Sequence, residues 1–434
     1  MKKIYYCVNC QLTTDIFLYY NAFNDCFLFL NNKKSLIYEK KSPEEIRKID
    51  STFFDLLVNN SFIVEDELDE LSITEFRKMH QKMNAYQYNI VVNTTLDCNL
   101  NCWYCYESKI EGSALNDSVL DIIKKNIVQK YDISPYKELK VSFFGGEPLR
   151  NFKAVEYLLL FCKSFSEQNN LSLIVDFTTN ATLINSKMLS FLKDYKCFFQ
   201  ITLDGDRERH NQIRFLKKNK KGTYDLVLRN IYRIQQTIPN AKTWIRLNFD
   251  DKTLANFPLI LEELLSLDRK RNYIILRKVW QFPIENIDKS LILDTLQIAT
   301  ENDFVTDYYT LPRHDVCFAD RYNQVLFNYD GKVFKCSTLE CFDDENTEGI
   351  VNEETGKISW NLNKISSKFT GRSPERCRNC KLYPACLGPC GKHTNNGDDF
   401  CCIVDATGLS IEEFVLFAFK QEQLRKKIFE EELL

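Results

Sequence analysis

Residues 88–105 read YNIVVNTTLDCNLNCWYC, an apolar strand-like run that passes directly into three closely spaced cysteines. The run YNIVVNTT (88–95) is followed by five segments of the same kind: LKVSFFG (139–145), SLIVDFTTN (172–180), CFFQITLD (197–204), TWIRLNF (243–249) and YIILRKV (273–279). Amphipathic segments at 118–131, 152–167 and 224–236 lie between them. Strands that alternate with helices predict parallel pairing with right-handed crossovers. The sequence therefore predicts an α/β fold whose functional residues lie at the C-terminal ends of the strands.

The pattern changes on both sides of this repeat. Residues 88–295 are suited to a partial (β/α)6 TIM-type barrel. Residues 1–87 predict a small α+β module, with a hairpin of CFLFLNN (26–32) and KKSLIYEK (33–40) and a capping box at Ser42-Pro43-Glu44-Glu45. Residues 296–434 form the third part: 310–402 are rich in Cys, Gly, Asp and Asn, and a helix is expected over 410–432. We therefore predict three domains.

Composition excludes several classes of protein. Of the 434 residues, 44% are hydrophobic, which excludes intrinsic disorder. The net charge of −3 argues against a partner that is bound through its phosphates, so no nucleic acid is expected. No apolar run reaches the ~18 residues that span a membrane, and the first residues lack the features of a signal peptide. A cytoplasmic protein is expected.

The 17 cysteines are unusual for such a protein. Because cytosolic thiols stay reduced, clustered cysteines there indicate metal or iron–sulfur ligands. Most of the cysteines fall into spaced groups. The remaining ones are Cys7, Cys10, Cys26, Cys162 and Cys197; we expect Cys162 and Cys197 to be buried thiols, and metal binding by Cys7 and Cys10 is the less favoured alternative.

The first group is Cys98-x3-Cys102-x2-Cys105, placed where the first barrel strand ends. Three thiolates hold three corners of an iron–sulfur cubane and leave one iron open to another ligand. A zinc ion would need a fourth ligand, and no further cysteine or histidine is close in sequence; the chain has only four histidines. The triad therefore favours a [4Fe–4S] cluster.

This group, with Tyr104 before its last cysteine, resembles the signature of radical S-adenosylmethionine (SAM) enzymes. In that family the open iron binds SAM, and SAM is cleaved reductively to a 5′-deoxyadenosyl radical that takes hydrogen from a C–H bond. The resemblance extends to residues at later strand ends that would contact SAM: Gly145, Gly146, Glu147, Asn180, Thr202, Asp204 and Arg214. Arg214, which follows His210, would hold the SAM carboxylate. Taken singly, Asn180, Asp204 and Arg214 could equally be turn or surface residues, and Tyr104 a core aromatic.

The second group of cysteines resembles the SPASM domain of radical SAM maturases, a C-terminal iron–sulfur domain with two auxiliary [4Fe–4S] clusters. The resemblance assigns Cys317, Cys336 and Cys390 to the first cluster, and Cys377, Cys380, Cys386 and Cys401 or Cys402 to the second; we assign Cys401. Structural zinc is the alternative for the run from Cys377 to Cys390. Together with the SAM-binding cluster, three [4Fe–4S] clusters are implied.

Two departures from the family pattern matter. Many relatives have a further cysteine just upstream of the first one, and this chain has none between Cys197 and Cys317. The first auxiliary cluster therefore either keeps an open iron, which we favour, or takes Cys341. Sulfatase maturases have an Asp directly after the cysteine equivalent to Cys336, where this chain has Ser337. That difference counts against sulfatase maturation.

The resemblance predicts a radical SAM oxidoreductase that modifies a ribosomally made peptide through a crosslink, for example a thioether. Its partners would be a precursor peptide with a leader and a flavodoxin- or ferredoxin-type reductant. Residues 1–87 are similar in outline to modules that bind a leader as an added β-strand, although a simple cap on the barrel is an alternative. Two other functions remain open: an anaerobic sulfatase-type maturase that forms formylglycine, and a non-catalytic iron–sulfur electron carrier.

Overall fold

The computed structural model describes residues 1–279, 281, 286–306, 314–339, 341–392 and 402–430. The chain divides into two compact units, each built from segments that are far apart in the sequence. The first unit contains residues 1–83, 309–317 and 368–423; the second contains 84–308, 318–367 and 424–434. The N-terminal module and most of the late cysteines thus belong to one unit.

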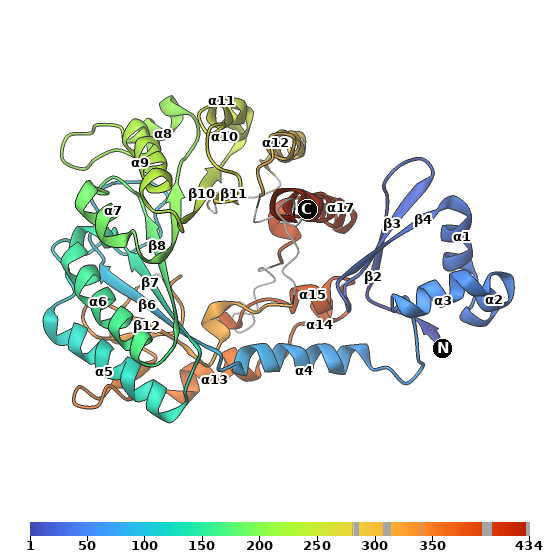
Figure 1. Ribbon diagram of the computed structural model, residues 1–434, viewed down its shortest axis with the longest axis horizontal. Helices are drawn as coiled ribbons and strands as arrows, with labels where there is room; N and C mark the ends of the chain where they lie inside the picture. Colours follow the sequence, from blue (N-terminus) through green and yellow to red (C-terminus); the bar gives the residue numbers. More distant parts are fainter. Residues whose placement is uncertain (280, 282–285, 307–313, 340, 393–401, 431–434) are drawn as a thin grey trace. The chain divides into compact units, whose positions relative to one another are not determined.

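A mixed sheet of ten strands organises the second unit (Figure 1). Six strands are parallel and neighbour one another in chain order: β6 (Gln87–Thr95), β7 (Glu138–Gly145), β8 (Ser172–Thr179), β9 (Lys196–Thr202), β10 (Lys242–Phe249) and β11 (Asn272–Lys278). These are the six strands that the sequence predicts, and the α/β class is confirmed.

Four further strands extend this sheet beyond β6 and were not predicted. The strand β12 (Gln324–Phe327) pairs with β6 in parallel. Next to it lie β13 (Val333–Phe334), β14 (Gly349–Val351) and β15 (Ile358–Trp360), all antiparallel. Segments of two to four residues are too short to show an alternating pattern in the sequence, so only their pairing identifies them.

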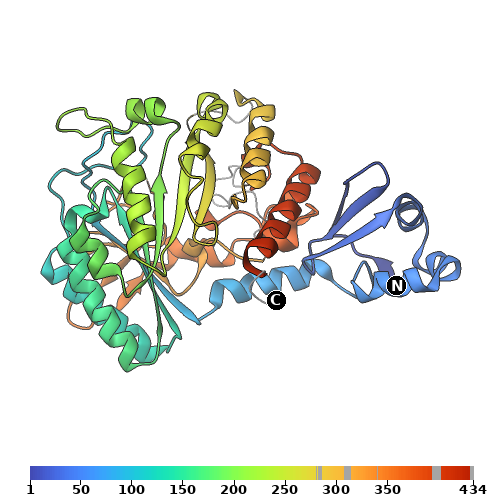
Figure 2. The ribbon, with the colours of Figure 1, turned by 45° about the horizontal axis from the view of Figure 1, so that its top comes forward.

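Helices connect the parallel strands of the second unit. They are α5 (Asp117–Ile133), α6 (Phe152–Gln168), α7 (Ser186–Leu192), α8 (Arg207–Ile213), α9 (Tyr224–Thr237), α10 (Asp251–Ala255), α11 (Phe257–Glu262) and α12 (Lys289–Glu301). Figures 1 and 2 show α5, α6 and α9 on one side of the sheet. On β7, β8 and β9, the rings of Phe143, Phe177 and Phe199 stack with centroids 5.2 Å apart in each neighbouring pair. This apolar layer fixes the strands whose ends carry the site.

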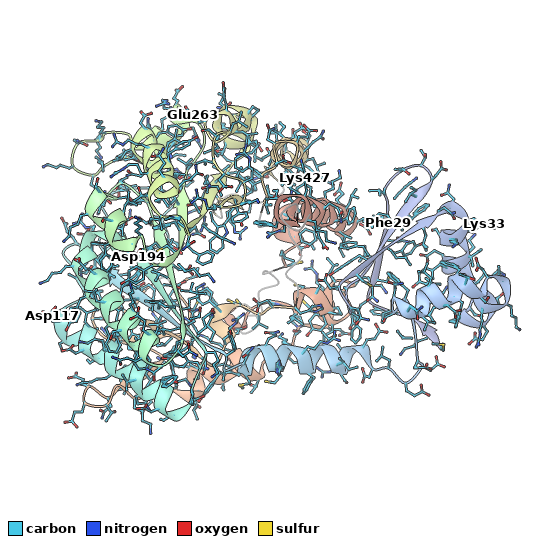
Figure 3. The ribbon with its side chains drawn as sticks, viewed as in Figure 1. Phe29, Lys33, Asp117, Asp194, Glu263 and Lys427 are labelled. Carbon is cyan, nitrogen blue, oxygen red and sulfur yellow. The ribbon has the colours of Figure 1, made fainter. Side chains whose placement is uncertain are left out.

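The first unit contains a three-stranded antiparallel sheet of β2 (Cys7–Gln11), β3 (Ile16–Asn21) and β4 (Cys26–Asn31). The helices α1 (Asn32–Lys40), α2 (Pro43–Ile49) and α3 (Ser51–Asn59) share one core with this sheet. Phe27 and Phe29 of β4 both contact Phe419 of α17 (Ile411–Glu430), and Figure 3 labels Phe29. The pair β1 (Lys2–Lys3) and β5 (Ile63–Val64) and the helices α4 (Glu70–Met83), α14 (Glu375–Arg378) and α15 (Tyr383–Cys386) complete this unit, and α13 (Leu362–Thr370) ends in it.

The predicted hairpin of 26–32 and 33–40 is wrong in its second strand. Residues 32–40 are the helix α1, and β4 pairs with β3 instead. The Asn31 side chain accepts a hydrogen bond from the backbone N–H of Lys34, which caps the helix, and Ser35 and Tyr38 are buried on one helical face. The capping box at Ser42 is confirmed, with Pro43 at the first turn.

Candidate active site

The cysteine triad lies in the loop that follows β6, as its sequence position predicts. Cys98 is buried, Cys102 is half-buried and Cys105 is exposed. Two N–H groups point at the Cys98 sulfur: the backbone N–H of Leu100, with N 3.4 Å from Sγ, and the side-chain amide of Asn180, with Nδ2 3.7 Å from Sγ. Burial raises the pKa of Cys98 to about 11, and the Leu100 N–H opposes this rise. The predicted residue Asn180 therefore lies beside the first cysteine.

Gly145 and Gly146 allow the end of β7 to pack directly on the segment that leads into Cys98. A β-carbon at Gly145, where φ is +109°, would lie 2.2 Å from the Thr95 carbonyl oxygen, and one at Gly146 would lie 2.4 Å from the Asp97 carbonyl oxygen. The backbone N–H groups of Gly146 and Glu147 donate to these same two carbonyls. The glycines are therefore required by a close approach of the chain to itself.

Glu147 is fully buried and ties the end of β7 to the end of β8. One carboxylate oxygen accepts from the Thr179 hydroxyl at 2.7 Å, and the other accepts from the backbone N–H of Asn180 at 2.7 Å. Burial raises the pKa of Glu147, and these hydrogen bonds oppose the rise. Its carboxylate thus fixes the backbone that presents Asn180 to Cys98.

Tyr104, Asp204 and Arg214 meet in one buried polar cluster, which also contains Asn248. The Tyr104 hydroxyl donates to the Asp204 carboxylate and accepts from Arg214 Nη1 at 2.8 Å. Arg214 forms an ion pair with Asp204 at 3.4 Å. Asn248 Nδ2 lies 3.1 Å from the Tyr104 hydroxyl and 3.0 Å from Asp204 Oδ1. Burial raises the pKa of Tyr104 well above its ordinary value, so the phenol stays protonated.

His210 and Thr223 hold the backbone of Asp204 and Arg214 through further hydrogen bonds. The backbone N–H of Asp204 donates to His210 Nδ1 at 3.2 Å, so the ring proton is on Nε2, which lies 3.0 Å from the Thr223 hydroxyl. That hydroxyl donates to the Arg214 carbonyl at 2.9 Å. Burial lowers the pKa of His210 well below its ordinary value. His210 is therefore a neutral residue that positions the two charged ones.

Two residues of this region were missed by the sequence reasoning. Asn248 is a polar residue near the end of β10, and that position was the available signal. Glu107 follows the triad, and both of its carboxylate oxygens are buried. Burial raises the pKa of Glu107 to about 8, and the Tyr106 hydroxyl opposes the rise only in part. The predicted residue Thr202 ends β9 and is half-buried.

A second group of cysteines lines a cavity of about 350 Å³ in the first unit. The four thiols are those of Cys377, Cys380, Cys386 and Cys402. Burial raises the pKa of Cys386 to about 12, and the proximity of the other three thiols adds to the rise. Cys401, the residue assigned from the sequence, lies outside the described residues, whereas its neighbour Cys402 is part of the cavity.

These four thiols bear on the zinc alternative for the run from Cys377 to Cys390. Within the described residues, no three His, Cys, Asp or Glu side chains are arranged to hold a single metal ion. A zinc site needs four ligands, each ~2.0–2.3 Å from one point. Thiolates are ligands of iron–sulfur clusters as well as of structural zinc, so the four thiols around this cavity fit either group.

The other late cysteines are divided between the units. Cys317 and Cys390 belong to the first unit, and Cys336 belongs to the second. The Cys336 sulfur accepts from the backbone N–H of Thr338 at 3.3 Å. Cys341 is exposed, and its sulfur lies 3.9 Å from the Ser108 hydroxyl, which is in the loop after the triad.

The cysteines without a motif behave largely as expected. Cys162 and Cys197 are completely buried, which confirms the prediction of buried thiols. Cys7 and Cys10 are three residues apart on β2, so their side chains point to opposite faces of the sheet. They are therefore not placed to bind one metal ion together.

Comparison with known proteins shows what parts of this chain resemble. Residues 92–257 match the Radical SAM superfamily. The radical SAM cyclopropyl synthase TigE of Paramaledivibacter caminithermalis is 22% identical over 411 residues, which cover 88% of this chain and 84% of that protein. A cysteine-type anaerobic sulfatase-maturating enzyme of Clostridium novyi is 24% identical over 332 residues, which cover 68% of this chain and 86% of that enzyme.

A solved structure described as "Native anSMEcpe with bound AdoMet and Cp18Cys peptide" has the same fold. It superposes with a TM-score of 0.59 at 18% sequence identity, and the match covers 79% of this chain and 99% of that chain. Among the described residues, no helix has both the length and the apolar character needed to cross a membrane.

Proposed function

Because this chain carries a radical SAM domain over residues 92–257, we propose that it is an enzyme that modifies a ribosomally made precursor peptide through a crosslink such as a thioether. The observation that carries the proposal is the convergence at the ends of β6 to β10. There Asn180 donates to the Cys98 sulfur and is held by the Glu147 carboxylate. Tyr104, from the same triad loop, bonds to Arg214. The name of the sulfatase-maturating relative and the peptide named with the solved neighbour support a polypeptide substrate.

The donor set fits the two groups that the family implies. Cys98, Cys102 and Cys105 would hold a [4Fe–4S] cluster, since thiolates are its usual ligands. Arg214 Nε is buried without a hydrogen-bond partner among the described residues, which leaves a cationic donor for the carboxylate of SAM. When bound, these groups supply a 5′-deoxyadenosyl radical for hydrogen abstraction. The protein's part is to orient SAM through Arg214, Asp204 and Tyr104.

Two auxiliary clusters complete the proposal. For the second cluster we now assign Cys402 as the fourth ligand in place of Cys401, because Cys402 lines the same cavity as Cys377, Cys380 and Cys386. The first one would use Cys317, Cys336 and Cys390, with either an open iron or Cys341 as its fourth ligand. The proposal also includes a partial barrel and the domain limits 1–87, 88–295 and 296–434. It includes a leader-binding role for the first domain, a flavodoxin- or ferredoxin-type reductant and a cytoplasmic location.

The choice of Cys402 has a direct test. Replacing Cys402 with Ala should abolish or shift the spectrum of the second auxiliary cluster and remove up to about 4 iron atoms per chain. The neighbouring substitution Cys401→Ala is the matched control and should leave iron content and spectrum at the parent values. Iron analysis with EPR of the reduced protein measures both. Loss of iron in Cys401→Ala alone would restore the assignment made from the sequence.

Asn248 should be required for tight SAM binding. In Asn248→Ala, Tyr104 and Asp204 lose a buried partner, so SAM should bind about tenfold more weakly, the usual penalty for an unsatisfied buried group. Asn248→Asp should weaken binding further, because a second carboxylate would lie against Asp204. Equilibrium dialysis of SAM with the reconstituted protein measures both variants. If the parent and Asn248→Asp bound SAM equally tightly, the position of Asn248 beside the Asp204 carboxylate would be contradicted.

The overall function is tested with the reduced enzyme and a short peptide encoded beside it. The expected results are 5′-deoxyadenosine and a peptide whose mass falls by about 2 Da, since a crosslink removes two hydrogens. Incubation with a sulfatase peptide that carries Cys or Ser tests the sulfatase-type alternative, in which formylglycine would appear. Absence of 5′-deoxyadenosine under all these conditions would favour the electron carrier.

A further inference from the structure

The helix α4 packs against the cysteine-containing segment inside the first unit. The Glu75 carboxylate accepts from the Tyr383 hydroxyl at 2.5 Å. One turn later, Lys78 Nζ donates to the Ser373 hydroxyl at 2.5 Å, and a further turn on, Lys82 Nζ donates to the Lys368 carbonyl. Lys78 and Lys82 are 5% and 2% exposed, which is rare for lysine. Two ammonium groups are thus buried beneath this segment.

Of these two lysines, Lys78 lies next to the four-cysteine cavity. Its partner Ser373 directly precedes Pro374, which lines the cavity. A β-carbon at Gly388, another lining residue, would lie 2.8 Å from the Ser373 hydroxyl, so the two residues are in contact. The backbone N–H of Gly388 in turn donates to the Cys386 sulfur. The Lys78 ammonium is therefore separated from a proposed cluster ligand by one serine and one glycine.

The electrostatics agree with this placement. Two cationic side chains lie beside the cysteine segment: Arg376 lines the cavity, and Lys78 is bonded to Ser373, which precedes the lining residue Pro374. Arg376 is exposed and paired with Asp405, so solvent and its partner screen its charge. Lys78 is shielded from solvent by its burial, so its field is screened much less. The Lys78 ammonium is thus a buried cation next to the lining of the cavity.

We propose that Lys78 stabilises the reduced state of the cluster held by Cys377, Cys380, Cys386 and Cys402. The inference rests on the proposed function, since it requires a cluster in this cavity. One electron from a low-potential one-electron donor adds one negative charge to the cluster, and no bond forms or breaks. A buried cation close to the ligands favours the more negative state and raises the midpoint potential. Lys78, which belongs to α4 of the N-terminal module, thus acts on the cluster through its positive charge and not as a ligand.

The test is a redox titration of the full-length reconstituted protein with dithionite, followed by EPR. The signal of the second cluster is identified as the one that Cys377→Ala removes. In Lys78→Met, the ratio of reduced to oxidised cluster at a fixed potential should fall about tenfold, which is 59 mV for a one-electron couple. Lys78→Arg keeps the charge and should match the parent. Lys82→Met is the matched control, one turn along the same helix, and should also match the parent.

Each result either supports or overturns the role of Lys78 at the cluster. An unchanged potential in Lys78→Met with full iron content overturns the inference, as does an equal shift in Lys78→Arg. If Lys78→Met does not retain the cluster, Lys78→Gln decides instead: it removes the charge but keeps a donor for the Ser373 hydroxyl, so the same tenfold fall is expected, and an unchanged potential overturns the inference. A parent protein in which Cys377→Ala removes no signal and no iron would instead refute the proposed cluster itself.

Discussion

Replacing Cys98, Cys102 and Cys105 together with Ala should abolish 5′-deoxyadenosine formation and lower the iron content from about 12 to about 8 atoms per chain. The three thiols are the proposed ligands of the SAM-binding cluster, and Cys98 receives hydrogen bonds from Leu100 and Asn180. The proposed ligands of the two auxiliary clusters are other cysteines, and four of them line a cavity in the first unit, so both clusters should remain. This is the largest effect on activity that we expect.

The control for the triple variant is Cys197→Ala, which removes a completely buried thiol of the same domain. It should keep both the iron content and 5′-deoxyadenosine formation. Iron analysis, EPR and chromatography of the reaction products make the comparison. The assignment of the triad would be refuted if the triple variant kept its full iron content. It would also be refuted if Cys197→Ala lost as much iron as the triple variant.

The parts of the fold that were predictable are those with a long local signal. The six parallel strands are apolar runs of seven to nine residues, and their alternation with helices indicates their pairing. Residues 33–40 were misread as a strand because their apolar side chains, Leu36, Ile37 and Tyr38, are few and adjacent. The cap supplied by Asn31 was the signal for a helix that was overlooked.

The candidate site shows the same division between local and distant information. Tyr104, Asp204 and Arg214 were found because each stands in a recognisable motif. Asn248 was missed because its role comes from hydrogen bonds to residues 144 and 44 positions away in the sequence. The choice of Cys402 over Cys401 likewise depends on a cavity, since adjacent residues have the same spacing from the earlier cysteines.

The grouping of the N-terminal module with the late cysteines is the least predictable feature. The Tyr6 hydroxyl donates to the Arg378 carbonyl at 2.8 Å, and the Tyr5 hydroxyl donates to the Asn379 carbonyl at 3.1 Å. These two carbonyls lie between Cys377 and Cys380. Glu70 of α4 accepts from the backbone N–H groups of both tyrosines and so fixes the strand end that carries them. These contacts join residues of the predicted first domain to the segment between Cys377 and Cys380 within one unit.

Deleting residues 1–83 should therefore cost the protein its second auxiliary cluster, about 4 iron atoms per chain, in addition to weakening peptide binding. The deletion removes the tyrosine contacts to the loop between Cys377 and Cys380, together with Glu75 and Lys78 of α4. Formation of 5′-deoxyadenosine without peptide should persist, because Cys98, Tyr104 and Arg214 all belong to the second unit. Iron analysis and product chromatography measure the two effects separately.

A gentler variant distinguishes a scaffold from a separable domain in the full-length protein. Tyr5→Phe/Tyr6→Phe removes only the two hydroxyls that hold the loop between Cys377 and Cys380. Each hydrogen bond contributes about 1 kcal/mol, so the loss of both should let iron leave the second cluster up to roughly thirtyfold faster in the presence of a chelator. The control Tyr232→Phe removes a hydroxyl that bonds to the Glu263 carbonyl in the second unit and should leave that rate unchanged. If the double variant releases iron at the parent rate and the truncated chain keeps its full iron content, the module is separable and its role is limited to the peptide.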